Sequence, residues 1–158
     1  MAESMPKNSA GVLLFRESAA GLEVLLAHPG GPLWAARDEG AWTIPKGEPS
    51  PGEDLLVAAQ REFAEEMGHP PSGEFLALGS ILQPSGKKIV YAWAAKSDFD
   101  VATLKSNLFE MEWPPKSGRR QEFMEVDRAE WFPIDLARQR ILSGQAPFLD
   151  RLLAAIAS

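Results

Sequence analysis

Residues 47–68 read Gly47-Glu-Pro-Ser-Pro-Gly-Glu53, then seven residues, then Arg61-Glu-Phe-Ala-Glu-Glu-Met-Gly68. The first part, with its glycines and prolines, is typical of a loop. The chain from residue 53 to residue 67 contains neither, and its apolar side chains recur at helical spacing, which predicts a helix with Glu53 and Asp54 in its first turn. Gly68 stands where helices commonly end in a left-handed residue. The apolar stripe of this helix comprises Leu55, Leu56, Ala59, Phe63 and Met67.

Three acidic residues of the predicted helix, Glu62, Glu65 and Glu66, stand at positions i, i+3 and i+4. At about 100° per residue, they share one side of the helix. Two interpretations of this pattern are open. One is a solvated acidic face with Arg61 as a partner, and the other is a site for a hard cation such as Mg²⁺, which prefers carboxylate oxygens.

Apolar runs on both sides of this stretch predict an α/β fold in which a mixed β-sheet is covered by helices. The runs at 10–15 and 22–27 are close enough to form a hairpin, and their continuity predicts burial on both faces. Residues 97–121 are expected to be irregular, apart from a short strand at 109–113. Further strands are expected at 41–44, 75–82 with a bulge at Gly79, 87–95 and 129–132, and C-terminal helices at 134–142 and 147–156.

The length of 158 residues fits one domain over residues 1–158, and the composition excludes several kinds of site. The absence of cysteine excludes disulfides, thiolate metal sites and cysteine nucleophiles, and the two histidines, His28 and His69, are too few for a site of three imidazoles. The formal charge of −6 argues against general nucleic-acid binding. A polar N-terminus and the lack of any apolar run of about 18 residues predict a cytoplasmic chain without a membrane span.

The sequence contains no P-loop, no dinucleotide-binding glycine motif, no nucleophile elbow and no His-Glu-x-x-His. The stretch at 47–69 instead resembles the Nudix box, Gly-x5-Glu-x7-Arg-Glu-U-x-Glu-Glu-x-Gly-U, where U is a bulky apolar residue. Eight of its nine specified positions agree, and the ninth is His69 in place of an apolar residue. The resemblance extends to residues 42–47 and 125–132. More loosely, the sequence is similar to the branch of Nudix hydrolases that acts on dinucleoside polyphosphates.

This resemblance implies a Nudix-type α/β/α sandwich with a mixed sheet and a catalytic loop-helix-loop. It implies hydrolysis of a nucleoside diphosphate linked to another group, with Mg²⁺ as cofactor and Mn²⁺ as a substitute. Arg61 would pair with Glu53 and hold the helix and loop in register. An acidic chain would repel a polyphosphate, and divalent cations would offset this repulsion and generate hydroxide from water. The metal ligands that the resemblance implies are Glu62, Glu65, Glu66 and the carbonyl of Gly47.

A general base has to accept a proton from the attacking water. The resemblance leaves its position open between the box and a later loop. The candidate in the box is Glu62, and the candidate in the later loop is Glu125, with Glu122 behind it. Either of the later residues could equally be a surface acid.

Basic and aromatic residues outside the box are the candidate substrate contacts. Lys46 would meet a phosphate as a point charge, and Tyr91, Trp93 or Trp34 would stack on a base, although aromatic residues in strands often belong to the core. The basic pairs would suit a polyphosphate chain, with solvated surface residues as the alternative. The candidate substrate contacts are Lys46, Lys87, Lys88, Tyr91, Arg119 and Arg120.

The expected substrate is a small nucleotide, with a dinucleoside polyphosphate or a nucleoside triphosphate ahead of a nucleotide sugar or a capped RNA 5′ end. A different class of function is a binding or regulatory module that has lost its metal-ligating residues, but all three acidic box positions are present here. A calcium-binding surface is a further alternative, without an EF-hand loop to support it. Dimerisation, common among similar proteins, is compatible with the sequence.

Overall fold

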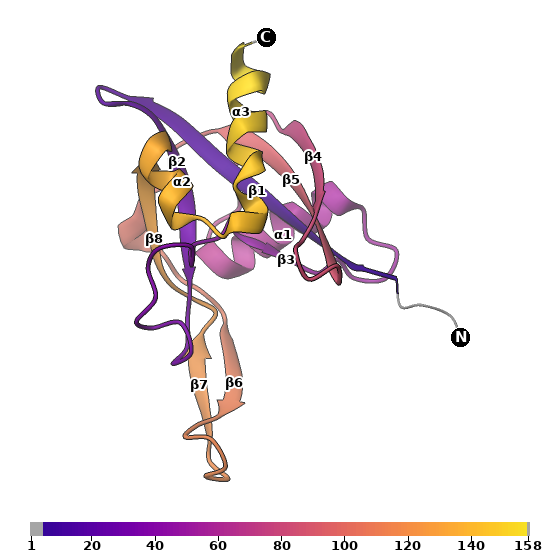
Figure 1. The fold of residues 1–158 in the computed structure, drawn as a ribbon, viewed down its shortest axis with the longest axis vertical. Helices are drawn as coiled ribbons and strands as arrows, with labels where there is room; N and C mark the ends of the chain where they lie inside the picture. The colour runs from indigo at the N-terminus through magenta and orange to yellow at the C-terminus, as the bar shows by residue number, and fades with distance from the viewer. Residues whose placement is uncertain (1–4, 158) are drawn as a thin grey trace.

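A computed structural model describes residues 5–157, so the first four residues of the polar N-terminal stretch lie outside the described residues. At its centre is a six-stranded mixed sheet with the order β4-β5-β1-β2-β8, and β3 pairs with β1 (Figure 1). The parallel neighbours are β1 and β5, and the other neighbouring strands of this sheet are antiparallel. Its strands are β1 (Lys7–Ser18), β2 (Gly21–Pro29), β3 (Lys46–Gly47), β4 (Leu76–Leu82), β5 (Lys88–Lys96) and β8 (Val126–Pro133).

Helices cover both faces of this sheet, as predicted from its apolar runs (Figure 1). The odd-numbered residues Leu13 and Phe15 of β1 face α2 and α3, while the even-numbered Val12 and Leu14 face α1. Each fully buried Leu or Phe side chain contributes about 1.5–3 kcal/mol relative to exposure. The helices are α1 (Leu55–Met67), α2 (Ile134–Arg140) and α3 (Pro147–Ala157), with short 3₁₀ turns η1 (Val101–Thr103) and η2 (Ser143–Gln145). None of the described helices is long and apolar enough to span a membrane.

The predicted hairpin and the bulge are both confirmed. Strands β1 and β2 close at the pair Ser18↔Gly21. The register between β4 and β5 shifts between Ala77 and Gly79, and Gly79 has a φ of 78°. Glycine adopts this conformation without the steric cost that a Cβ would add.

The strand predicted at 41–44 is wrong: this segment forms only isolated bridges, Ala27↔Thr43 and Trp42↔Ile141. Thr43 exchanges two backbone hydrogen bonds with Ala27, and the ladder cannot extend to Pro45, which has no N–H to donate. The strand of this region is β3, just beyond Pro45. The helix predicted at 134–142 ends two residues earlier, where Ile141 turns extended to pair with Trp42.

The start of α1 also differs from the prediction. Asp54 has extended dihedrals and caps the helix from outside, its carboxylate accepting from the N–H groups of Leu56 and Val57 at 3.1 Å each. Glu53 therefore lies in the loop and not in the first turn. Caps of this kind contribute about 1 kcal/mol. At the other end, Gly68 has a φ of 94°, which confirms the predicted left-handed helix end.

The region predicted to be irregular contains a second, two-stranded sheet. Strands β6 (Leu108–Glu112) and β7 (Arg120–Met124) form a hairpin, here called the arm, that projects away from the main sheet (Figure 1). The strand expected at 109–113 is thus present, and its partner was missed because Arg120–Glu122 carries no apolar residue. At its base, the ring of Phe109 lies against Gly31.

Candidate active site

The structure places Arg61 of α1 and Glu53 of the preceding loop in a two-point contact. Nε and Nη2 of Arg61 donate to the two carboxylate oxygens of Glu53, each at 2.9 Å. Hydrogen bonds from Arg61, and then one from the backbone of Ser50, lower the pKa of Glu53 to about 2. Bidentate pairs of this kind fix direction as well as distance. The pair therefore holds the loop against the helix.

The remaining Arg61 nitrogen reaches two of the acids that the sequence singled out. Nη1 donates to Glu62 at 2.9 Å and to Glu65 at 3.2 Å. The carboxylates around Arg61, first of all Glu53, raise its pKa. The side chain of Glu65 is 42% exposed, whereas that of Glu62 is 14% exposed.

Glu66 lies on the inner side of α1 and is in a different environment. Only 8% of the residue is exposed. Burial raises the pKa of its carboxyl to about 8, Glu62 and Glu125 add to the rise, and the charge of Lys46 opposes it. Burial also lowers the pKa of Lys46, and the neighbouring charge of Lys88 lowers it further.

Glu62 and Glu125 complete this inner group of acids. Burial raises the pKa of Glu62, with Arg61 opposing the rise. Burial also raises the pKa of Glu125, and the charges of Glu62 and Glu65 add to the rise. Gly47 lies against Glu62, and a Cβ at this position would collide with the Glu62 carboxylate. A glycine is therefore what allows the loop backbone and this carboxylate to meet.

A cavity of about 260 Å³ opens beside these acids. Glu66 and Glu125 line it together with Lys46, so α1, β3 and the start of β8 all contribute to its walls. Trp34, from the loop after β2, supplies an aromatic wall. The other lining residues are Pro29, Thr43, Val126 and Leu142.

A buried histidine that the sequence reasoning did not assign supports two walls of this cavity. His28 is 0% exposed, and its ring nitrogens lie 2.7 Å from Oδ1 of Asp127 and 2.6 Å from the carbonyl oxygen of Arg37. It thus joins the segment after Glu125 to the loop that carries Trp34. The two partners are distant in sequence from each other, so no local pattern could have indicated this contact.

The other predicted substrate contacts are spread over the molecule. Lys87 and Lys88 line a second cavity of about 590 Å³, together with Lys7 and Glu48. Tyr91 lies within β5, opposite Ala10 of β1, and lines none of the cavities described here.

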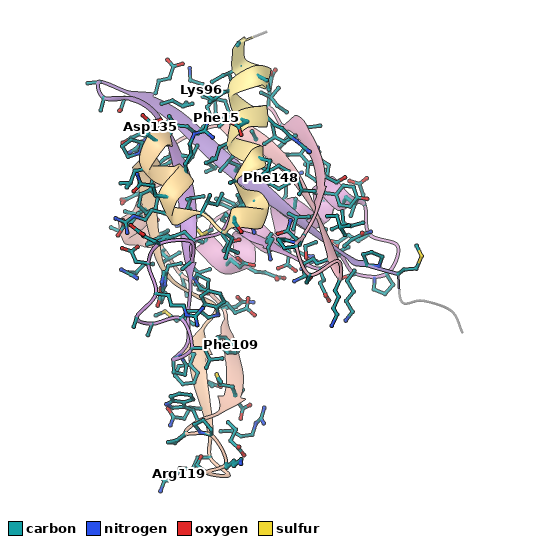
Figure 2. All side chains as sticks on the ribbon, viewed as in Figure 1. Phe15, Lys96, Phe109, Arg119, Asp135 and Phe148 are labelled. Atoms are coloured by element: carbon teal, nitrogen blue, oxygen red, sulfur yellow. The ribbon has the colours of Figure 1, made fainter. Side chains whose placement is uncertain are left out.

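Arg119 and Arg120 belong to the arm, and Figure 2 shows Arg119 at its far end. The side chain of Arg120 donates to Glu110 at 3.1 Å, and Glu122 stands opposite Glu110 in the β6–β7 backbone register. The structure thus does not bring Arg119, Arg120 or Glu122 to the cavity.

The donor set around the inner acids fits a hard divalent cation. Over residues 5–157, no three His, Asp or Glu side chains lie in the geometry of a ready-made metal site, and Glu62 and Glu65 contact Arg61. Still, the donors are carboxylate oxygens, and burial and mutual repulsion raise the pKa values of Glu62, Glu66 and Glu125. A cation would relieve this repulsion, and carboxylate oxygens are the ligands that Mg²⁺ prefers.

A family model described as NUDIX domain matches residues 5–152. The chain therefore belongs to the NUDIX domain family, in agreement with the box at 47–69. The chain is 34% identical over 101 residues to an 8-oxo-(d)GTP phosphatase of Mycolicibacterium smegmatis, covering 63% of this chain and 26% of that protein. It is 46% identical over 50 residues to an RNA pyrophosphohydrolase of Caulobacter vibrioides, covering 28% of this chain and 29% of that protein. The chain thus matches less than a third of the length of these curated relatives.

Solved structures of the family share the fold. The NUDIX domain of Shewanella oneidensis NrtR complexed with ADP ribose superposes with a TM-score of 0.66 at 15% identity, covering 98% of this chain and 90% of that one. A binary complex of a C. elegans Ap4A hydrolase superposes with a TM-score of 0.63 at 20% identity, covering 94% of this chain and 98% of that one. At these identities the likeness supports the mixed α/β fold.

Proposed function

We propose that this chain is a divalent-metal-dependent hydrolase that cleaves a phosphoanhydride bond in a nucleoside diphosphate linked to another group. The observation that carries the proposal is the inner acid group, in which Glu62, Glu66 and Glu125 gather with raised pKa values beside an open cavity. Carboxylates outnumber cationic side chains there. Membership of the NUDIX family adds independent support.

The metal ligands would be Glu62, Glu65, Glu66 and the carbonyl of Gly47, holding Mg²⁺ or Mn²⁺. When bound, the ion neutralises phosphate oxygens and lowers the pKa of a coordinated water. Glu62 and Glu65 would exchange their contacts with Arg61 for the cation. Arg61 keeps its two-point contact with Glu53, so the loop and α1 stay in register through this exchange.

Glu125 is the proposed general base. Its carboxylate accepts no hydrogen bond from a basic side chain within the described part of the chain, whereas Glu62 is held by Arg61. A base with a raised pKa takes a proton more readily. The water oxygen attacks phosphorus, its proton passes to Glu125, and the bridging P–O bond breaks with its electron pair on the departing phosphate.

The proposed substrate is a dinucleoside polyphosphate or a nucleoside triphosphate. The cavity beside Glu66 has an aromatic wall in Trp34 and a cation in Lys46, which suit a base and a phosphate. Its volume of about 260 Å³ suits one part of a nucleotide. The second cavity, with Lys7, Lys87 and Lys88, offers positive charge for a longer phosphate chain.

A panel of phosphoanhydrides assayed with Mg²⁺ tests this proposal. The panel contains a dinucleoside tetraphosphate, a nucleoside triphosphate, 8-oxo-dGTP, a nucleotide sugar and RNA with a 5′-triphosphate. Mass spectrometry of both products in ¹⁸O-water identifies the phosphorus that is attacked. We expect turnover of a polyphosphate that stops when EDTA is added. Tight binding without any product across the panel would instead establish a binding module.

A further inference from the structure

The segment 105–107 connects α1 to the strand that follows Glu125. The N–H of Lys105 donates to the carbonyl of Met67 at 3.1 Å, and the N–H of Asn107 donates to the carbonyl of Glu65 at 3.0 Å. In return, the N–H of Glu125 donates to the carbonyl of Asn107 at 3.0 Å. Asn107 therefore lies between the helix of the acids and Glu125, in a region whose sequence pattern gave no functional assignment.

The side chain of Asn107 reaches the Glu125 carboxylate itself. With the amide oriented so that its nitrogen faces the neighbouring oxygens, Nδ2 donates to Oε2 of Glu125 at 3.0 Å and to the carbonyl of Glu65 at 3.2 Å. The opposite orientation would place the amide oxygen against two acceptors, which cannot bond to it. Among residues 5–157, no other group donates to the Glu125 carboxylate.

We propose that Asn107 is a positioning residue that orients Glu125 for proton transfer. This inference rests on the proposed function and assigns the orientation of its base. The hydrogen bond from the Asn107 amide to Oε2 leaves Oε1 of Glu125 free to accept the proton of the attacking water. A glutamate side chain that is free to rotate loses conformational entropy each time it takes the reactive position, and a fixed donor removes part of that cost. The second bond, to the carbonyl of Glu65, ties this orientation to α1.

A double-mutant cycle tests the proposal, because it separates an effect that acts through Glu125 from a general loosening of the segment. In the otherwise unchanged chain, Asn107→Ala should lower kcat by about 10-fold with KM within about 2-fold. Asn107→Asp should lower kcat further, because a carboxylate there repels Glu125. In the Glu125→Gln background, Asn107→Ala should change kcat by less than about 2-fold.

A matched control is available in the neighbouring residue. Ser106 accepts a hydrogen bond at 2.9 Å from the N–H of Val126, donates one at 2.8 Å to the backbone carbonyl of Asn107, and makes no hydrogen bond to the Glu125 carboxylate. Ser106→Ala removes a contact of the same segment, and it should keep kcat within about 3-fold. Thermal unfolding of each variant verifies that it is folded.

The outcomes separate this inference from the proposed function. An Asn107→Ala penalty of the same size in both backgrounds, or none in either, would overturn the positioning role. Full turnover by Glu125→Gln would remove Glu125 as the base and this inference with it. A large loss in Glu125→Gln together with normal turnover in Asn107→Ala would overturn only this inference.

Discussion

The acids next to the two sides of α1, Glu53 in the preceding loop and Glu66 within the helix, are in opposite situations. On the outer side, Arg61 binds Glu53 at two points and lowers its pKa to about 2. On the inner side, Glu66 is buried beside Glu62 and Glu125, and its pKa rises to about 8. Lys46 offsets only part of this repulsion. The difference indicates which acids hold the loop and the helix together and which remain available for a cation and a substrate.

The largest effect is expected for Glu66→Gln, which removes the most buried acid of the inner side. We expect kcat to fall by at least about 10³-fold with Mg²⁺, because several kcal/mol of charge stabilisation depends on a bound ion. Steady-state hydrolysis of the best substrate of the panel measures this loss. The control is Glu110→Gln on the arm, whose carboxylate pairs with Arg120. Equal activity of the two variants would show that the inner side has no special role.

The next effect concerns stability and pH without metal. The pKa of Glu66 is about 8 in the folded chain against a reference of 4.5, so between these values the folded state keeps a proton that the unfolded state releases. The free energy of unfolding should therefore fall as pH rises through this window, by a few kcal/mol, and level off above it. Urea unfolding in EDTA at several pH values measures the slope. The slope should flatten in Glu66→Gln. An unchanged slope would contradict the view that Glu66 takes up the proton in the folded state.

A smaller loss of kcat is expected when the contact between Arg61 and Glu53 is weakened. Arg61→Lys keeps the charge but cannot make the two-point contact with Glu53. We expect kcat to fall by about 10–100-fold, because a shifted loop misplaces Gly47 and Glu62. Comparison of kcat and KM across the panel measures it. An unchanged kcat would mean that the contact is not needed to hold the loop.

The smallest effect separates the cations of the cavity from those of the arm. Lys46→Gln should raise KM by about 10-fold, since Lys46 lines the cavity beside Glu66. Arg119→Gln should leave KM within about 2-fold, because Arg119 lies at the far end of the arm. A larger rise in KM for Arg119→Gln than for Lys46→Gln would reverse this order and assign substrate binding to the arm.

The loop-helix-loop could be predicted because its information is local. The spacing of apolar residues, the glycine at 68 and the acids at i, i+3 and i+4 are all contained within two dozen residues of sequence. The start of the helix was predicted less well, because Asp54 acts as a cap through its side chain. A propensity pattern does not distinguish an acid in the first turn from one that caps it.

The parts that could not be predicted depend on contacts between distant residues. The N–H of Ile44 donates to the side chain of Gln145, 101 positions away, and no local pattern indicates this contact. Lys46 and Arg119 look alike as basic residues near glycine, yet one lines the cavity and the other lies on the arm. The amide of Asn107 meets Glu125 only because the arm returns the chain to its starting point.

Calorimetric titration with Mn²⁺ tests the central claim most directly, by comparing a variant of each side of α1. The double variant Glu62→Gln with Glu66→Gln should bind Mn²⁺ at least about 100-fold more weakly than the unmodified chain. Glu53→Gln, on the outer side, should weaken the affinity by no more than about 10-fold, because it loosens the loop that carries Gly47 but removes no carboxylate ligand. Wild-type affinity in the double variant would contradict the assignment of a metal site to the inner side of α1.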